Sequence, residues 1–490
     1  MVIANPRMTF AILQSLRQIV GADGLLSEPE RLRTYESDGL TNYRVMPAGV
    51  VLPRSTAQVQ AVVRLCHEHR IPFVARGHGT GLSGGALPVA DGLVISLARM
   101  NRVLAVDYEN ARIVVEPGVI NLHVTQHVAA RGYYYAPDPS SQQVCSIGGN
   151  VAENSGGAHC LKYGFTTNHV LGATVVLPDG EIAHIGGTTL DTPGLDLLGV
   201  MVGAEGTLGV VTEVTLRLTR RPEAVQLVMG AFETTDQAGG AVSDIIAAGI
   251  LPAAMEMMDN LSIQAVELAT HAGYPTTAGA LLLVELDGPL AEVDALIGSI
   301  ESICRTNGAW EVRRAADAAE RALMWKGRKA AFAAMGRMSP NYYVQDGVIP
   351  RTTLPAVLRR IDELAAEYDM RVANVFHAGD GNLHPLVLYD GRITGELDRA
   401  EELATKILLT CVEHGGSLTG EHGIGVDKMK HMPKLFTEDD LDTMQRVRCA
   451  FDPHHLSNPG KVFPTPRLCG ETPGPGHLHP LVESGQAEMF

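Results

Sequence analysis

The chain is 490 residues long, 45% hydrophobic and 19% charged, which is typical of a soluble globular protein with two or more domains. Its 39 basic and 55 acidic side chains leave a formal net charge of −16. This charge disfavours nucleic acid and anionic lipid as partners, because both are polyanions. No stretch approaches the ~18 consecutive apolar residues of a membrane span. The apolar N-terminal patch is interrupted by Gln and Arg and lacks a signal-peptide cleavage site, so it predicts an amphipathic helix in a cytoplasmic protein.

The seven cysteines are scattered along the chain, and no two of them have C-x-x-C spacing. This distribution argues against a disulfide scaffold, a cysteine-based zinc site and an iron–sulfur cluster. We expect reduced, buried thiols.

The first third of the chain alternates short strands with a helix. Ser55 followed by Gln58 is a capping-box pattern, and the apolar residues after it recur at helical spacing. The strand-like runs lie at 50–53, 71–75, 93–97, 103–106 and 112–115.

A glycine-rich loop follows the second of these strands. Gly79, Gly81 and Gly84 satisfy G-x-G-x-x-G, but turn residues and another strand come next, where a dinucleotide fingerprint requires a helix. A Rossmann NAD site is therefore not expected. Five glycines in nine residues, from Gly77 to Gly85, still favour a loop whose amides cradle phosphate, with hydroxyls and Arg76 as further donors.

Two later segments, 137–157 and 202–218, again place small residues beside strands. Three such segments in one domain predict a large cofactor that lies along the backbone.

From about residue 222 onward, strand-like runs at 226–232 and 279–285 alternate with helical stretches at 290–306 and 315–335, which indicates a second α+β domain.

The segments RGHGTGLSGGALP, PDPSS…SIGGNVAENSGG and GAEGTLGVVTEVTLRL resemble the FAD-binding domain of the vanillyl-alcohol oxidase (p-cresol methylhydroxylase, PCMH-type) superfamily. The match is to the branch of D-lactate dehydrogenases, D-2-hydroxyglutarate dehydrogenases and the D subunit of glycolate oxidase. The resemblance extends over residues 13–464. It implies an α+β fold in which a PCMH-type FAD-binding domain of two subdomains is joined to an α+β cap domain.

The implied division is a FAD-binding domain at 1–222, a cap with the metal and catalytic motifs at 223–435, a segment returning to the FAD domain at 436–465, and a loose tail at 466–490. FAD is expected to bind without a covalent bond, because His78 lies two places before the attachment histidine of other members and Thr80 stands there instead. The implied FAD-binding residues are Arg76, Gly77, His78, Gly79, Thr80, Gly81, Ser83, Gly84, Pro137, Asp138, Ser141, Gly148, Gly149, Asn150, Ser155, Gly156, Gly157, Glu205, Gly206, Val211 and Asn458.

A histidine–carboxylate set lies in the second half of the chain. His377 and His384 occur in NVFHAGDGNLHP, whose glycines and proline favour a strand and loop over a helix, and Glu421 and His422 occur in TGEHGIG. Two imidazoles and one carboxylate can hold a divalent metal with open positions. A histidine in such a loop is more often an ordinary hydrogen-bonded polar residue, so spacing alone leaves the metal site open.

The resemblance implies that His377, His384 and Glu421 bind a divalent zinc, manganese or iron ion, and that His422 is the catalytic base. Arg328 corresponds to the W-x-x-R arginine that grips the substrate carboxylate. An exposed helix face is the alternative for that arginine, since Lys326 and Lys329 are its neighbours.

The function expected from this resemblance is FAD-dependent oxidation of glycolate or D-lactate to the 2-oxo acid. Val344 stands where hydroxyglutarate-type members carry a lysine for a second carboxylate, which disfavours a dicarboxylate substrate. The alternatives are a D-2-hydroxyglutarate or other long-chain dehydrogenase, or a non-catalytic flavin-fold subunit. Electron-accepting flavin or iron–sulfur partner subunits are expected, and such a partner could hold the protein peripherally at a membrane.

Overall fold

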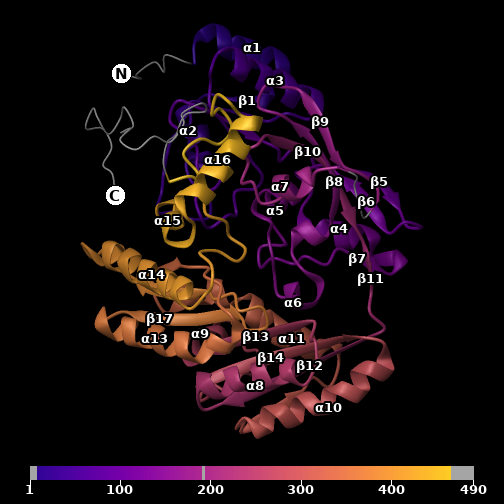
Figure 1. The fold of residues 1–490 in the computed structure, drawn as a ribbon, viewed down its shortest axis with the longest axis vertical. Helices are drawn as coiled ribbons and strands as arrows, with labels where there is room; N and C mark the ends of the chain where they lie inside the picture. The colour runs from indigo at the N-terminus through magenta and orange to yellow at the C-terminus, as the bar shows by residue number, and fades with distance from the viewer. Residues whose placement is uncertain (1–7, 190–193, 465–490) are drawn as a thin grey trace.

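Three large β-sheets and one two-stranded sheet organise residues 8–189 and 194–464, which the computed structural model describes. In Figure 1 the first two sheets occupy the upper half of the molecule, and the third occupies the lower half. The predicted α+β class is confirmed.

The first sheet has four strands in the order β1-β2-β4-β3, and β2, β4 and β3 are parallel. Their bounds are Leu25–Leu26, Gly49–Val51, Leu93–Ser96 and Phe73–Arg76. Helices α1 (Phe10–Val20) and α3 (Thr56–Glu68) share a hydrophobic core with this sheet.

The start of α3 follows the predicted capping pattern in part. The Ser55 hydroxyl accepts a hydrogen bond from the Gln58 amide at 3.3 Å, and the apolar residues at helical spacing are buried. The Gln58 side chain reaches one residue further back than a capping box requires, and accepts from the amide of Arg54 at 2.7 Å.

Between β3 and β4 the described chain forms turns and contains no helix from residue 77 to 92. The expectation that this loop is not a Rossmann fingerprint is confirmed. Asn458, from the far end of the chain, donates to the Gly85 carbonyl at 2.9 Å and thereby fixes one end of this loop.

The second sheet is antiparallel, with the strand order β5-β6-β10-β8-β9. The bounds are Val103–Asp107, Arg112–Val115, Val210–Arg217, Val170–Val176 and Ile182–Gly186. Helices α4 (Asn121–Val128) and α5 (Ile147–Glu153) bury their apolar faces against it. A short pair, β7 (Tyr133–Tyr134) with β11 (Thr219–Arg220), lies beside them.

The third sheet has seven antiparallel strands in the order β15-β12-β14-β13-β17-β18-β16. In that order the bounds are Glu311–Arg314, Ala224–Phe232, Ala280–Gly288, Ala254–Asp259, Arg371–His377, Pro385–Tyr389 and Asn341–Val344. Successive side chains of a strand point to opposite faces. Helices cover both faces, so the central strands are almost continuously buried.

One face of this sheet packs against α8 (Thr235–Ala247), α10 (Leu290–Thr306), α13 (Leu354–Glu367) and α14 (Glu396–Glu413). The other face packs against α9 (Asn260–Thr270), α11 (Ala318–Lys329) and α12 (Ala331–Ala334). The helix predicted at 315–335 is therefore two helices that meet at Ala330.

The chain returns to the first sheet after the cap. Helices α15 (Met432–Leu435) and α16 (Glu438–Phe451), yellow in Figure 1, lie beside the upper half of the molecule. Beyond them Ser457 pairs with Phe73, and the Asn458 amide donates to the Phe73 carbonyl at 2.8 Å. The whole of the predicted tail, 466–490, lies outside the described residues, and Cys469 with it. Five cysteines are free and buried: Cys66, Cys145, Cys160, Cys304 and Cys411.

The helices of the described residues are too short or too polar to cross a membrane. The 18-residue helix α14 shows why, since its sequence ELDRAEELATKILLTCVE carries charges throughout its first half.

A polar contact joins the two halves of the molecule. His159 lies with Nδ1 at 3.0 Å from Asp138 and Nε2 at 3.0 Å from Glu285 of β14. Burial opposes the protonated imidazole, but the two carboxylates outweigh it and hold the pKa of His159 well above its ordinary value. The protonated histidine therefore links the second sheet's loops to the third sheet.

Replacing His159 by Gln should lower the free energy of unfolding by about 2 kcal/mol at pH 6, because hydrogen bonds to charged groups are lost. A folded-state pKa raised above the unfolded value gives a contribution that is complete below about pH 6.5 and disappears as the pH rises through the folded pKa. Guanidinium unfolding of both proteins from pH 6 to pH 10 should show the gap closing. The exposed His123 of α4, changed to Gln, is the control. A gap that does not change with pH would contradict this role.

Candidate functional site

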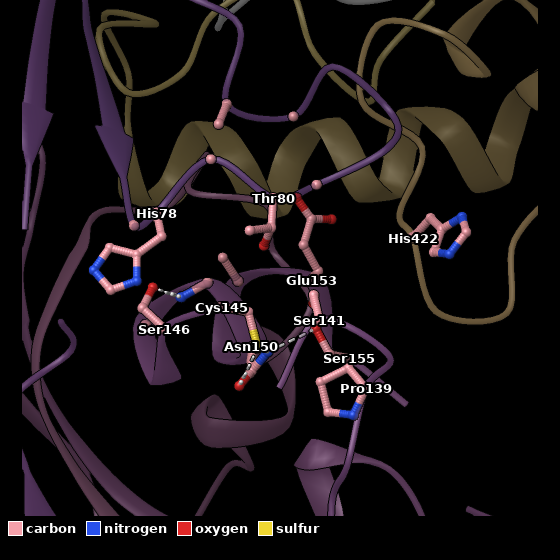
Figure 2. A pocket seen from close by; sticks show the side chains of 18 of the residues that line it. His78, Thr80, Pro139, Ser141, Cys145, Ser146, Asn150, Glu153, Ser155 and His422 are labelled. Carbon is pink, nitrogen blue, oxygen red and sulfur yellow. Dashed lines mark hydrogen bonds between the residues drawn. The ribbon is translucent and has the colours of Figure 1, made fainter. Parts of the chain in front are cut away.

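A cavity of about 390 Å³ lies where the first two sheets meet the third, a volume within the ordinary range for small-molecule sites. Its walls come from the loop after β3, the start of α5 and the turn before β10. The remaining wall comes from α11, α12, β16 and the 421–422 segment. Figure 2 shows His422 approaching from a C-terminal segment, on the opposite side of the cavity from His78 and Ser146.

The three small-residue segments expected to contact one cofactor do converge on this cavity. Two-thirds of the residues expected to bind it line the wall. They are Arg76, Gly77, His78, Gly79, Thr80, Gly81, Ser141, Gly148, Gly149, Asn150, Ser155, Glu205, Gly206 and Val211.

Ser83 and Asn458 lie outside this lining and support it from behind. The Ser83 hydroxyl donates to the His422 carbonyl at 2.8 Å. The Asn458 amide group donates to the carbonyl of Glu205 at 2.6 Å, in addition to that of Gly85. Both side chains therefore join the glycine-rich loop to C-terminal segments.

The other expected residues outside the lining have structural contacts. Gly84 has a φ of +77° and lies against Val426. The Pro137 carbonyl accepts from Asn121, and Asp138 pairs with His159 and Lys329. Added Cβ atoms at Gly156 and Gly157 would lie 2.9 Å from Glu421 and 2.5 Å from the Asp138 backbone, so both positions require glycine to let neighbouring segments approach closely.

Several lining residues were missed by the sequence analysis, among them Cys145, Ser146, Glu153, Lys329, Phe332 and Tyr342. Ser146 caps α5 by accepting from the Gly149 amide at 3.4 Å. Its position before a helical pattern was a signal that could have revealed it. Phe332 and Tyr342 carry no such signal, because only the packing of α12 and β16 brings them to the cavity.

The His377–His384–Glu421 set is assembled and buried. His377 ends β17, His384 precedes β18 as the strand-and-loop prediction requires, and Glu421 lies in the loop after α14. The Oε1 atom of Glu421 is 3.5 Å from His377 Nε2 and 3.2 Å from His384 Nε2.

These donor atoms fit a divalent metal. The Nε2 atoms of both histidines and Glu421 Oε2 are buried and have no hydrogen-bond partner in the described structure. Buried polar atoms are rarely left without a partner. Two imidazoles and one carboxylate whose ligand atoms lie within 4.8 Å of one another form a donor set for zinc, manganese or iron.

Asp346 holds the loop that carries Glu421 and His422. Its fully buried carboxylate, just after β16, accepts from the His422 amide at 2.9 Å and from Lys428 Nζ at 3.2 Å. Burial opposes ionisation of this carboxyl, but its electrostatic interactions with His422 and Lys428 outweigh that effect and hold the pKa of Asp346 well below its ordinary value.

His422 lines the cavity together with Glu421, whereas His377 and His384 lie behind them. Its ring stacks on that of His384 with centroids 5.0 Å apart, and its Nε2 lies 3.7 Å from Glu421 Oε1. Burial lowers the pKa of His422 to about 4, with the neighbouring His384 adding to the effect. The imidazole is therefore neutral near physiological pH, the form that can accept a proton.

Arg328 is buried in α11 and forms an ion pair with Glu256, whose Oε2 lies 2.5 Å from Arg328 Nη2. It does not line the cavity, although its neighbour Lys329 does. The Nε–H of Arg328 has no acceptor among the described residues. The expected alternative of an exposed helix face is wrong for Arg328, which is 3% exposed.

Two known families match successive parts of the chain. Residues 47–186 match the FAD binding domain family, and residues 221–462 match the family FAD linked oxidases, C-terminal domain. The chain is 51% identical to the glycolate oxidase subunit GlcD of Escherichia coli over 96% of this chain and 94% of the relative. It is 34% identical to a D-lactate dehydrogenase of Anaerostipes hadrus, over 86% and 90% respectively.

Solved structures share the fold at low sequence identity. A p-cresol methylhydroxylase structure superposes with a TM-score of 0.79 at 18% identity, and covers 92% of this chain and 96% of its own. A 4-ethylphenol oxidase from Gulosibacter chungangensis gives a TM-score of 0.76 at 18% identity, with the same coverage. The expected PCMH-type fold is confirmed.

Gly149→Val should remove most of the bound FAD, because the added side chain projects from a residue of the cavity wall. The variant should otherwise fold, since a Cβ at this position meets only the Ser146 hydroxyl, at 3.4 Å. The FAD-to-protein absorbance ratio after purification measures the loss. Gly298→Val is the matched control, because that helical glycine of α10 is exposed and has no atom within 4 Å of an added Cβ. Equal FAD content in the two variants would contradict the assignment.

Proposed function

This chain belongs to the family of FAD-linked oxidases, and we propose that it oxidises a short 2-hydroxy acid, glycolate or D-lactate, to the 2-oxo acid. Oxidoreductase activity and FAD as its cofactor follow from the family. The substrate is proposed from the site and from the names of its relatives.

The observation that carries the proposal is the position of the His422 imidazole on the cavity wall, in contact with a buried set of metal-ligand type. Oxidation of an alcohol removes a hydride from carbon and a proton from oxygen. His422 would accept the hydroxyl proton at a ring nitrogen. Bound FAD supplies the hydride acceptor.

His377, His384 and Glu421 would hold the divalent ion that polarises the substrate hydroxyl and lowers its pKa. The two histidines and Glu421 are positioned by three different elements, and their unpartnered donor atoms face one another. All four residues needed for this chemistry are present, so a non-catalytic flavin-fold subunit is the less favoured candidate.

Arg328 would bind the substrate carboxylate through its Nε–H, which has no acceptor among the described residues. An arginine fork suits a carboxylate better than a lysine does. The Glu256 ion pair occupies Nη2 and leaves Nε for the substrate.

A short substrate is favoured by the residues around His422. Phe332 and Tyr342 line the adjacent wall, and the ring of Phe332 packs edge-on against His384 with centroids 5.7 Å apart. Val344 is 5% exposed and belongs to the hydrophobic core of the third sheet, where it offers no cation for a second carboxylate. The hydroxyglutarate alternative therefore has no supporting residue at this position.

Reduced FAD would pass its electrons to a partner. The relative from Escherichia coli is named as a subunit of a glycolate oxidase, which supports partner subunits for this chain as well. We propose that this electron transfer takes place in the cytoplasm, and that a partner subunit would hold this protein peripherally at a membrane.

Anaerobic addition of glycolate or D-lactate to the purified holoprotein should bleach the flavin absorbance, whereas D-2-hydroxyglutarate should reduce the flavin more slowly, because Val344 offers no cation for its second carboxylate. Stopped-flow absorbance gives the reduction rate for each acid. A flavin that stays oxidised with both short acids, or that is reduced fastest by the dicarboxylate, would overturn the proposed substrate class.

His422→Asn should slow flavin reduction by about 10²–10⁴-fold while FAD remains bound, because general-base catalysis contributes a factor of that size. Stopped-flow absorbance with saturating glycolate measures the rate. His414→Asn is the control, since that histidine follows α14 and its Nδ1–H donates to the Thr410 carbonyl at 2.8 Å. An unchanged rate in the His422 variant would remove it as the base.

A further inference from the structure

Glu256 is a buried carboxylate in the middle of the third sheet. It lies on β13 between Met255 and Met257, and all three side chains are at most 1% exposed. A charged group in such surroundings is costly unless it is paired. The expected function gives Glu256 no role, so its partners indicate what it does.

The first partner is the metal-ligand residue His377. The two residues stand opposite each other on the paired strands β13 and β17, and Glu256 Oε1 lies 2.7 Å from His377 Nδ1. A carboxylate can only accept here, so Nδ1 carries the hydrogen. In the neutral imidazole, Nε2 is then unprotonated and directed at Glu421, 3.5 Å away.

The second partner is Arg328. The other carboxylate oxygen of Glu256 contacts its guanidinium at 2.5 Å, and both side chains are at least 97% buried, at 0% and 3% exposure. One carboxylate therefore contacts both the residue proposed to bind the metal and the residue proposed to bind the substrate carboxylate.

We propose that Glu256 is a positioning residue that sets the spacing between the metal ligand His377 and the substrate-binding Arg328. The inference rests on the proposed function, because a 2-hydroxy acid carries its hydroxyl and carboxylate on adjacent carbons. Two groups that bind these at once must keep a fixed separation. The strand register between β13 and β17 holds His377 beside Glu256, and the ion pair holds Arg328 of α11 beside the same carboxylate.

The test is the affinity of the FAD-loaded protein for Zn²⁺ and Mn²⁺, measured by competition with a chromogenic chelator. Glu256→Gln keeps the shape of the side chain and loses the charge that stabilises His377, so metal affinity should fall about 10–100-fold. The KM for glycolate should rise as well, because Arg328 loses its fixed position.

Glu116→Gln is the matched control. Glu116 is also a buried carboxylate, 4% exposed, that pairs with an arginine, Arg102, at 2.8 Å, but it lies at the end of β6, outside the set of metal-ligand type. Its replacement should leave metal affinity and KM unchanged. Bound FAD, read from the visible spectrum, reports that each variant is folded.

Glu256→Asp is a second variant for the case in which the glutamine variant fails to retain FAD. It preserves the charge but is one methylene shorter, so it cannot reach both partners, and it should also weaken metal binding. Equal metal affinity in wild-type protein and in a folded Glu256 variant would overturn the inference while leaving the proposed function in place. Weaker metal binding in the variant, together with a wild-type flavin that no 2-hydroxy acid reduces, would support the inference and overturn the proposed substrate.

Discussion

The site depends on how one loop is held between two buried carboxylates. Residues 419–425 carry Glu421 and His422, and their backbone amides donate to Asp346, beside the third sheet, and to Glu205, shortly before β10 of the second sheet. Glu205 accepts from the amides of Ile424 and Gly425 at 2.6 and 2.7 Å. Because Asp346 and Glu205 belong to different halves of the molecule, the loop is where the two halves become one site.

Close approach at this loop explains much of the glycine content around it. A Cβ at Gly425 would lie 2.1 Å from the Ser83 carbonyl, and the residue has a φ of +54°. A Cβ at Gly420 would lie 2.6 Å from the Asn382 side chain. Glycine is needed because another backbone or a buried polar group occupies the space where a side chain would start.

The features that could be predicted from the sequence are those that depend on neighbouring residues or on a recognisable motif. The capped helix after Ser55, the absence of a helix after the glycine-rich loop and the strand-and-loop context of His377 and His384 all follow from neighbouring residues. These features depend on backbone chemistry within a few positions, which a single sequence contains.

The partners of the site residues could not be predicted in the same way. Glu256 contacts His377 across 121 positions, and Asp346 contacts the His422 amide across 76. Such pairs depend on which strands become neighbours and in what register. Glu256 is an acidic residue among the apolar residues of the buried strand β13, and this contrast is a signal in the sequence that the strand also has a chemical role.

The return of the chain to the first sheet has a consequence for the order in which the protein is made. The strand that begins at Phe73 pairs with Ser457, and the loop after it is fixed by Asn458. A ribosome adds about 5–20 residues per second, so the glycine-rich loop waits tens of seconds for the segment that completes it. Until then the wall of the cavity is incomplete, and the third sheet must be synthesised before the cavity can close. Completion of this cavity is therefore a late event in biosynthesis, coupled to the folding of nearly the whole chain.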